Sequence, residues 1–599
     1  MRGRTRVSVV GLGYVGLSTA ACLAEKFDVT GIDVDERKVE QIGRGVAPFS
    51  ERSLTPLLKR QVRNGSLKCT TGYEGVGDSE FVFVTVGTPS DSSGRIDLSH
   101  VRAAAHSVGD AISGARRRRI DVLLKSTVIP GTARRLVKRV IEERSGRACG
   151  EGFGLCSNPE FLREGSAIED TMRPSRIVIG PFDTSSGRRA LSLYKKFYGE
   201  GMMPPVVETT PEMAELIKYA SNAFLAMKVS FINTVARICE KIPQGHVDSV
   251  ARGIGLDNRI GTRFMEAGPG FGGSCFPKDI KALIRFAQDI GVDASLLEAT
   301  LKVNETQPEH ILSTAESMLR GLNGRKVAIL GLSFKPDTDD VRESRSMMLI
   351  EKLIQRGAKV AVYDPVAMER ARSEIGSNAD FTQNVEECLE DADLAIVMTS
   401  WDEFRGIREG DFVSLMKTPR VIDARRIYDP SRFVATDFAA VGVGPRATAR
   451  SGNSYSISSG GGAINTGDSG EVPMSDGKVP VTSGQRMITG AVVKDDERYV
   501  VTDYGLPDGL TLSTTELKPN KATRGHSHPT PEFYIFFDEC NLTLGSEARA
   551  VKVGDIVHVG PNEFHKVEAA GRQCRFVSLF WGERASVQAI YATLDDMWR

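Results

Sequence analysis

A glycine-rich segment with a single cysteine is the part of this chain best suited to covalent chemistry. Residues 268–279 read Gly-Pro-Gly-Phe-Gly-Gly-Ser-Cys-Phe-Pro-Lys-Asp, so Cys275 follows four glycines and precedes Lys278. A thiolate is a strong nucleophile, and a nearby cation or helix N-terminus lowers the pKa of a thiol. Glycines also let backbone N–H groups approach a substrate closely. The alternative, for the segment taken alone, is a flexible loop with an idle thiol.

Three further side chains could take part in proton transfer. Glu160 follows an expected strand, in Asn-Pro-Glu-Phe-Leu-Arg-Glu-Gly. Lys218 and Asn222 are four residues apart in a helical pattern, so they share one face of that helix. Both are costly to bury among apolar neighbours unless they are partnered, which favours a catalytic role. The alternative is an edge position from which Lys218 reaches water.

A glycine pattern near the N-terminus predicts a dinucleotide site. Gly11-Leu-Gly13-Tyr-Val-Gly16 directly follows a short apolar strand and opens a helical stretch, which places phosphates at a helix N-terminus. Asp33 ends the next strand, where a carboxylate accepts hydrogen bonds from ribose hydroxyls and repels a 2′-phosphate. NAD is therefore favoured over NADP, a preference that Lys38 nearby weakens. An ordinary tight turn between strand and helix is the alternative.

Two more strand ends point toward the same crevice. Thr88 follows one strand in Val-Gly-Thr-Pro, and Thr127 follows another in Lys-Ser-Thr-Val. Ligands of open α/β sheets bind beyond the carboxyl ends of the strands, so both threonines are candidates to contact cofactor or substrate. A plain turn or cap role is the alternative for each.

Strand and helix patterns divide the chain into five segments. Short apolar runs that alternate with helical patterns predict doubly wound parallel sheets. The expected parallel strands of the first sheet are 6–10, 29–33, 81–86, 122–126 and 176–180. We expect a Rossmann-like NAD-binding domain over 1–205, a central helical domain with the cysteine loop over 206–315, a second Rossmann-like domain with a nucleotide-type sheet over 316–440, a flexible Gly/Ser-rich linker over 441–485, and an all-β domain over 486–599.

A long helix begins at Thr209-Thr210-Pro211-Glu212 and runs without internal glycine or proline to about Glu240. Between Met213 and Ile238 it is apolar on most faces, so we expect it to be buried between domains or subunits.

Composition excludes several classes of function. Lys+Arg and Asp+Glu both number 77 in the 599 residues, which argues against a chain-wide nucleic-acid partner. No apolar run approaches the roughly 18 residues that span a bilayer, so no membrane segment is expected. The nine cysteines lack paired spacing, which fits free thiols in a reducing, cytoplasmic environment.

Seven motifs, taken in their order along the chain, resemble the UDP-glucose/GDP-mannose dehydrogenase family. The resemblance covers residues 1 to about 440 and rests on the glycine motif 11–16, Gly-Thr-Pro at 87–89, Lys-Ser-Thr at 125–127, the Asn-Pro-Glu motif 158–165, Lys-Tyr-Ala-Ser-Asn at 218–222, the cysteine loop 270–279, and Phe-Lys-Pro-Asp-Thr-Asp-Asp-Val-Arg-Glu-Ser at 334–344. It implies oxidation of a sugar C6 alcohol to a carboxylate with two NAD per turnover.

The resemblance also implies roles for individual residues. Lys218, Asn222, Asp279 and a water would serve the first oxidation, Cys275 would form a thiohemiacetal and then a thioester, and Glu160 with Thr127 would assist hydrolysis. The implied cofactor residues are Gly11, Gly13, Gly16, Asp33, Lys38, Thr88, Thr127, Lys278 and Arg345. The implied substrate residues are Phe161, Leu162, Glu164, Lys218, Asn222, Arg259, Phe271, Gly272, Lys335 and Arg426, with Arg259 reaching a neighbouring subunit of a homodimer or larger oligomer.

The motif variants lean toward UDP-glucose as substrate, with GDP-mannose as the alternative. A different class of function, a redox-inactive nucleotide-sugar-binding scaffold, would need none of the acyl-transfer groups.

His526 and His528 alternate on an expected strand in the C-terminal segment, Glu532 follows, and Gly-Asp-Ile-Val-His-Val-Gly-Pro leads to His565. With these residues the segment resembles the two motifs of the cupins. The resemblance implies a small barrel in which these four residues bind Mn, Fe, Ni or Zn. A metal-free barrel is the alternative, and the domain could modify a related sugar or only bind one.

Overall fold

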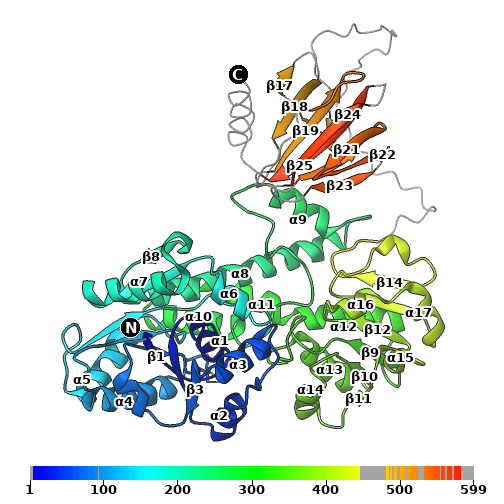
Figure 1. Ribbon diagram of the computed structural model, residues 1–599. Coiled ribbons are helices and arrows are strands. Elements are labelled where there is room, and N and C mark those ends of the chain that lie inside the picture. The colour runs from blue at the N-terminus through cyan, green and yellow to red at the C-terminus, as the bar shows by residue number, and fades with distance from the viewer. Residues whose placement is uncertain are drawn as a thin grey trace. The chain divides into compact units, whose positions relative to one another are not determined.

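The computed structural model describes residues 4–91, 93–445, 481–483, 486–488, 491–495, 499–505, 510–523, 532–553, 555–559, 563–569 and 573–581. Clustering of contacts divides the chain into two compact units, Met1–Ser451 and Gly452–Arg599. Both are drawn in Figure 1. Among the described residues, no helix has the length and apolar character required to cross a bilayer.

The first sheet of the larger unit has eight strands in the order β3-β2-β1-β4-β5-β6-β7-β8. The chain builds outward from β1 in both directions, which opens a crevice at the carboxyl ends of β1 and β4. The bounds are β1 (Arg6–Val10), β2 (Asp28–Ile32), β3 (Leu67–Thr70), β4 (Phe81–Val84), β5 (Ile120–Leu124), β6 (Phe153–Ser157), β7 (Ile177–Pro181) and β8 (Val206–Glu208).

One strand direction in this sheet corrects the sequence-based prediction. β7 pairs antiparallel with β6, although every strand was expected to be parallel. A parallel return needs a crossover of a dozen or more residues, usually a helix that packs across the sheet. The connection from β6 to β7 instead forms the loop that carries Glu160 and the six-residue helix α6 (Ala167–Met172).

Buried strands and helices form the core around this sheet. Apolar residues from β1, β4 and β5 are almost entirely buried, and two clusters of apolar side chains pack around the sheet. The helices are α1 (Tyr14–Leu23), α2 (Glu36–Gly43), α3 (Leu54–Arg63), α4 (Ser99–Ser113), α5 (Arg139–Ser145) and α7 (Thr184–Tyr198), with a π-helical turn, η2 (Ala133–Lys138), leading into α5.

The long helix is α8 (Pro211–Cys239), and the Thr210 hydroxyl caps it by accepting the Met213 N–H. Its 29 residues span about 44 Å. Four more helices follow: α9 (Val247–Gly255), α10 (Phe276–Asp289), α11 (Ser295–Glu305) and α12 (Gln307–Leu319). The expected burial holds for only part of α8, because Phe224, Phe231 and Ile238 are more than half exposed.

The second sheet of this unit is entirely parallel, in the order β11-β10-β9-β12-β13-β14. Its strands are β9 (Lys326–Leu330), β10 (Lys359–Tyr363), β11 (Asp380–Phe381), β12 (Leu394–Val397), β13 (Arg420–Asp423) and β14 (Asp437–Ala440). Its helices are α13 (Arg345–Gln355), α14 (Met368–Ile375), α15 (Val385–Leu389), α16 (Asp402–Arg405) and α17 (Glu409–Leu415). The expected second nucleotide-type sheet is therefore present.

The smaller unit is built from antiparallel strands. A six-stranded sheet has the order β17-β18-β19-β25-β20-β23, and a three-stranded sheet has the order β22-β21-β24. The strands are β15 (Val481–Ser483), β16 (Arg486–Ile488), β17 (Ala491–Asp495), β18 (Tyr499–Gly505), β19 (Leu510–Leu517), β20 (Glu532–Phe536), β21 (Cys540–Leu544), β22 (Glu547–Val551), β23 (Ile556–Val559), β24 (His565–Ala569) and β25 (Cys574–Trp581). Pairing between the described strands leaves these as separate sheets and closes no barrel.

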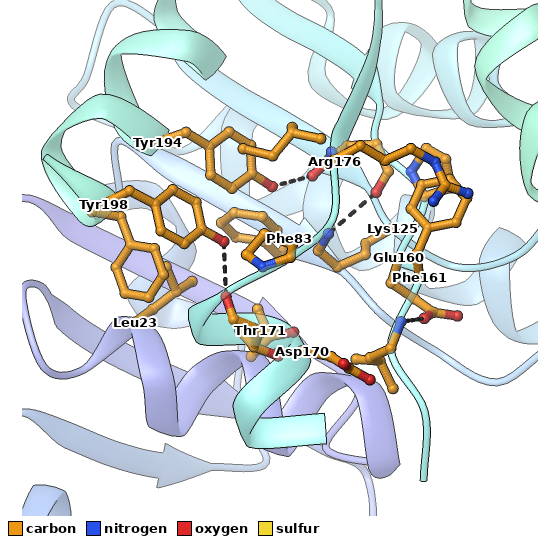
Figure 2. Close-up of a pocket in the computed structure, with 17 residues that line it drawn as sticks. Leu23, Phe83, Lys125, Glu160, Phe161, Asp170, Thr171, Arg176, Tyr194 and Tyr198 are labelled. Atoms are coloured by element: carbon orange, nitrogen blue, oxygen red, sulfur yellow. Dashed lines mark hydrogen bonds between the residues drawn. The ribbon is translucent and has the colours of Figure 1, made fainter. Parts of the chain in front are cut away.

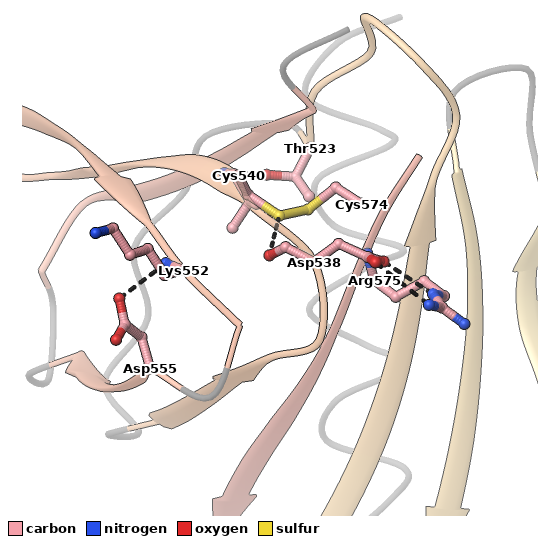
Figure 3. The surroundings of a disulfide bond; sticks show 8 residues. Thr523, Asp538, Cys540, Lys552, Asp555, Cys574 and Arg575 are labelled. Carbon is pink, nitrogen blue, oxygen red and sulfur yellow. Dashed lines mark hydrogen bonds and ion pairs between the residues drawn. A yellow bond between two sulfur atoms is a disulfide. The ribbon is translucent and has the colours of Figure 1, made fainter. Parts of the chain in front are cut away.

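A disulfide joins the six-stranded and the three-stranded sheet of the smaller unit. Cys540 at the start of β21 bonds to Cys574 at the start of β25, as Figure 3 shows. The expectation that all nine cysteines are free thiols is therefore wrong for this pair. Sequence spacing could not reveal it, because the packing of two sheets brings together residues 34 positions apart. The other seven cysteines are free.

Candidate functional site

A buried ion pair joins two of the predicted catalytic residues. Lys218 Nζ on α8 lies 2.8 Å from Glu160 Oε1, and the two side chains are only 4% and 8% exposed. The second carboxylate oxygen, Glu160 Oε2, accepts the N–H of Leu162 at 2.7 Å. The attraction between the two groups offsets part of the cost of burying both charges. The alternative of an edge position, with Lys218 reaching water, is therefore wrong.

The cysteine loop meets α8 through an amide and a carboxylate. Cys275 is the residue immediately before α10, and Asp279 lies in the first turn of that helix. Asn222 Nδ2 donates to Asp279 Oδ2 at 2.7 Å, while Lys278 Nζ donates to Asp279 Oδ1 at 2.6 Å. The Asn222–Asp279 bond fixes the thiol-bearing end of α10 beside the helix that carries Lys218.

The pKa of Cys275 differs from the sequence-based expectation. Burial raises the pKa of this thiol to about 11, and the charge of Lys218 opposes the rise without cancelling it. Asp279 and Glu160 raise the thiol pKa further. The expected activation of the thiol fails because desolvation outweighs the nearby cation, and Lys278 is paired with Asp279. The free thiol is therefore protonated at neutral pH.

The pKa of Lys218 moves in the opposite direction to that of an isolated buried lysine. Burial by itself lowers it, but Glu160, Cys275 and Asp279 together raise it above its ordinary value. Lys218 is therefore an ammonium group at neutral pH, and it can stabilise an anion that forms near it.

We predict that alkylation of Cys275 by iodoacetamide is slow at pH 7 and accelerates about tenfold per pH unit toward pH 11, because only the thiolate reacts. Peptide mass spectrometry would measure the rate. Cys149, whose pKa burial also raises to about 11, provides a reference thiol in the same digest. A Lys218→Met variant should slow Cys275 relative to Cys149. A Cys275 rate that levels off near pH 8 would contradict the raised pKa.

A serine that the sequence analysis did not single out contacts the thiol. Ser274 Oγ donates to Glu164 Oε1 at 2.7 Å and lies 3.5 Å from Cys275 Sγ. Burial raises the pKa of Glu164 to about 7, and the charge of Asp340 adds to the rise. Lys335 Nζ from the second sheet donates to the backbone carbonyl of Glu164. The structure thus brings Glu164 and Lys335 to the cysteine loop.

Contacts from two other segments hold the cysteine loop. Asn304 on α11 accepts the Phe271 N–H at 2.7 Å and donates to the Phe271 carbonyl at 2.9 Å. A Cβ on Gly272 would lie 2.4 Å from the Glu343 carbonyl oxygen, so only glycine fits there. The buried Arg345 donates to Glu343 at 3.0 Å, and its Nη1 has no hydrogen-bond partner among the described residues. Gly272 and Arg345 thus both contact Glu343, and Phe271 is held by Asn304.

The predicted dinucleotide site has the shape that a pyrophosphate needs. A Cβ on Gly16 would lie 1.8 Å from the Gly11 carbonyl oxygen, so the loop packs closely only with glycine there. Gly13 immediately precedes α1. Asp33 is buried after β2 and accepts the Leu12 N–H at 2.7 Å. The residues present fit NAD, with phosphates at the start of α1 and a carboxylate for the ribose.

Lys38 and Thr88 border the same crevice. Lys38 Nζ lies 3.1 Å from Asp33 Oδ2, which places a cation beside the carboxylate that was expected to contact a ribose. The Thr88 hydroxyl donates to the Thr127 carbonyl at 2.8 Å, so the two predicted strand-end threonines are in contact.

Two predicted arginines make other contacts. The Arg259 side chain is 89% exposed and pairs with Asp257 at 2.7 Å. Arg426 pairs with Asp248 and donates to the Val441 carbonyl at 2.8 Å. Neither arginine forms a hydrogen bond or ion pair with Cys275, Lys218, Glu160, Asn222 or Asp279 in this chain.

A pocket lies beside the loop that carries Glu160. Figure 2 shows Lys125, Glu160 and Phe161 facing Tyr194 and Tyr198 across it. Its lining includes neither Cys275 nor Asn222. Burial lowers the pKa of Lys125 to about 8.

The predicted metal ligands lie mostly outside the described residues. His526 and His528 are not among them, and of Glu532 only the backbone is described. His565 is buried on β24, with Nδ1 2.9 Å from the Glu563 carbonyl oxygen. Among the described residues no cluster of three or more metal-ligand side chains occurs.

Comparisons with known proteins place the larger unit. Three sequence models of the UDP-glucose/GDP-mannose dehydrogenase family match: the NAD binding domain over residues 5–198, the central domain over 212–306, and the UDP binding domain over 328–430.

Individual relatives extend this match to nearly their whole length. A UDP-glucose 6-dehydrogenase from Rhizobium meliloti is 42% identical over 446 residues, which are 73% of this chain and 99% of the relative. A UDP-glucose 6-dehydrogenase from Pseudomonas aeruginosa is 39% identical over 74% of this chain and 98% of the relative. The solved structure of a UDP-glucose dehydrogenase from Pyrobaculum islandicum has a TM-score of 0.68 and 39% sequence identity. The match covers 74% of this chain and 99% of that protein. The chain therefore belongs to the UDP-glucose/GDP-mannose dehydrogenase family and is an NAD-dependent nucleotide-sugar dehydrogenase.

Proposed function

We propose that this chain oxidises C6 of UDP-glucose to UDP-glucuronate, using two NAD per sugar. The observation that carries the proposal is the pair of buried contacts, Lys218 with Glu160 and Asn222 with Asp279, whose charged groups act electrostatically on the Cys275 thiol. A binding scaffold would need no nucleophile beside an ion pair. The choice of UDP-glucose rests on the relatives, several of which are UDP-glucose 6-dehydrogenases at 39–42% identity.

The first oxidation uses the polar face of α8. Lys218, Asn222 and Asp279 would orient the C6 hydroxyl and a water that removes its proton. The ammonium of Lys218 would stabilise the developing alkoxide in a site from which bulk water is excluded. NAD, when bound, supplies the hydride acceptor.

The second oxidation uses the thiol. Cys275 would add to the aldehyde carbon and form a thiohemiacetal, with Lys218 stabilising the oxyanion. Loss of the C6 hydride, and of the proton from the hydroxyl whose oxygen becomes the carbonyl, would leave a thioester on Cys275. Glu160 would accept the proton of the attacking water, and Thr127 would position that water. The raised pKa of Cys275 means that its proton must be removed during this step rather than before it.

We assign the remaining contacts from the family resemblance and the placement of the residues. The NAD site would comprise Gly11, Gly13, Gly16, Asp33, Lys38, Thr88, Thr127, Lys278 and Arg345. The sugar nucleotide would be bound by Phe161, Leu162, Glu164, Lys218, Asn222, Phe271, Gly272, Lys335 and Arg426, with Arg259 supplied by a neighbouring subunit.

A panel of nucleotide sugars with NADH absorbance as readout tests the proposal. UDP-glucose should give two NADH per sugar consumed and UDP-glucuronate as product. Faster turnover of GDP-mannose would move the assignment to the alternative substrate. One NADH per sugar would reduce the enzyme to a simple alcohol dehydrogenase, and none from any sugar would favour the scaffold.

We further propose that α8 mediates a homodimer. Phe224, Phe231 and Ile238 recur at seven-residue intervals and are 59%, 53% and 56% exposed in the single chain. An apolar stripe of this kind is favourable only when covered. Light scattering should give twice the 65.1 kDa chain mass, and Phe231→Glu should lower it.

For the smaller unit we propose a cupin-like metal-binding module that acts on or binds a related sugar. The support is its antiparallel sheets and the burial of His565, whose ring is oriented by a backbone carbonyl as metal-binding histidines commonly are. His526, His528, Glu532 and His565 would hold the ion, which could polarise a sugar carbonyl. Metal analysis of the full chain and of a His565→Ala variant tests this, since equal metal content in both would remove the proposal.

A further inference from the structure

A second buried carboxylate, outside the network described above, connects two catalytic segments. Glu215 on α8 is 3% exposed. Its Oε2 accepts the Gly131 N–H at 2.5 Å, and its Oε1 accepts the Ala133 N–H at 2.8 Å. These donors lie more than 80 residues earlier in the chain, at the end of the segment that begins at β5 and includes Thr127.

Glu215 is also a neighbour of Lys218 on α8. Glu215 precedes Lys218 by three residues, so the two side chains are neighbours on one face of α8. Both line a small cavity together with Thr127, Ser126, Ser157 and Pro159. The contact thus joins the segment with Thr127 to the face of α8 that presents Lys218.

The hydrogen bonds from Gly131 and Ala133 also offset the cost of burying the Glu215 carboxylate. Burial raises the pKa of Glu215 to about 7, while its bonds from the Ala133 and Gly131 N–H groups oppose the rise. A buried carboxylate is destabilising unless such charge-assisted bonds compensate it. The segment that it holds enters η2, a π-helical turn, and such turns are frequent at functional sites.

We propose that Glu215 is a positioning residue for thioester hydrolysis, holding the Thr127 segment at the distance from Lys218 at which the attacking water is aligned. The inference rests on the proposed function. In the step concerned, the water oxygen bonds to the acyl carbon, its proton passes to Glu160, the C–S bond breaks, and the Cys275 sulfur leaves as thiolate. The hydride-transfer steps depend on Cys275, Asn222, Asp279 and Lys218, and the hydrogen bonds of Glu215 go instead to Gly131, Ala133 and Ser157.

The test is a Glu215→Gln variant of the full chain. In the wild-type chain the Gly131 and Ala133 N–H groups each donate to a separate carboxylate oxygen of Glu215. A glutamine side chain has only one acceptor oxygen, so its NH₂ group would face one of these two N–H donors. Rapid mixing with NAD and UDP-glucose should show a burst of two NADH per active site, followed by steady turnover about 10- to 100-fold slower than wild type. Intact-protein mass spectrometry after acid quench should find a UDP-glucuronyl thioester on most Cys275, and the KM for UDP-glucose should stay within about twofold because the substrate contacts are untouched.

A matched control lies one turn earlier on the same helix. Glu212 also joins α8 to η2, through its ion pair with Arg134, but at the surface. Glu212→Gln should behave as wild type in the burst and in the adduct.

The outcomes separate the inference from the function beneath it. Glu215→Gln with unchanged turnover, or with burst and turnover slowed equally and no adduct, overturns the inference. If Glu215→Gln fails to fold, Glu215→Asp keeps both acceptors on a shorter arm and is judged by the same two readouts. A wild-type chain that yields fewer than two NADH per sugar overturns the proposed function. If the wild-type chain yields two NADH per sugar and the Glu215→Gln variant accumulates no thioester on Cys275, only the role of Glu215 is overturned.

Discussion

A Cys275→Ser variant should form no UDP-glucuronate at a measurable rate, with acid production reduced about 1000-fold or more. A serine hydroxyl is a far weaker nucleophile than a thiolate, and the buried site raises even the thiol pKa to about 11. The first hydride transfer requires no thiol, so up to one NADH per active site should still appear. Stopped-flow absorbance with product chromatography measures both quantities.

A second free thiol provides the control for this substitution. Cys149 is half-buried and lies outside the Cys275 network, so Cys149→Ser should keep two NADH per sugar. The covalent role of Cys275 is refuted if Cys275→Ser makes the acid at near wild-type rate.

A Lys218→Met variant should lose both activity and stability. Without the ammonium, the Glu160 carboxylate remains buried with no ion-pair partner, which costs about 3–5 kcal/mol of unfolding free energy. Loss of the charge that stabilises the alkoxide should lower kcat by about 1000-fold. Urea unfolding and the NADH rate measure the two effects separately.

A double variant separates these two roles of Lys218. Combining Lys218→Met with Glu160→Gln removes both charges, so most of the lost stability should return while activity stays absent. Lys228 on the same helix, which donates to the Ile260 carbonyl at 3.0 Å, is the matched control, and Lys228→Met should change stability by less than about 1 kcal/mol. Recovery of activity in the double variant would show that Lys218 only neutralises Glu160.

Much of the candidate site could be predicted from where motifs fall relative to strands and helices. Carboxyl ends of parallel strands meet at one edge of a sheet, so Thr88 and Thr127 were expected near each other, and their 2.8 Å hydrogen bond confirms this. Helical periodicity likewise placed Lys218 and Asn222 on one face of α8, where each meets a partner of the same network.

Residues that act through partners distant in the chain were missed. Ser274 was passed over inside the quoted motif, because only its 2.7 Å bond to Glu164 distinguishes it from a loop serine. Glu215 had one available signal, its spacing of three residues from Lys218. The antiparallel β7 and the Cys540–Cys574 bond had none, since strand direction and sheet packing are set by contacts that no local pattern encodes.

The sequence by itself determined the chemical groups of this enzyme and the strand end, loop or helix face on which each is found, because periodicity and glycine spacing are local properties. Only the tertiary structure decided their charge states and pairings: that Lys218 is buried against Glu160, that Lys278 is paired with Asp279, and that the Cys275 thiol is harder to ionise than a free one. Desolvation and Coulomb interactions depend on distances through space, and those distances join residues that are far apart along the chain.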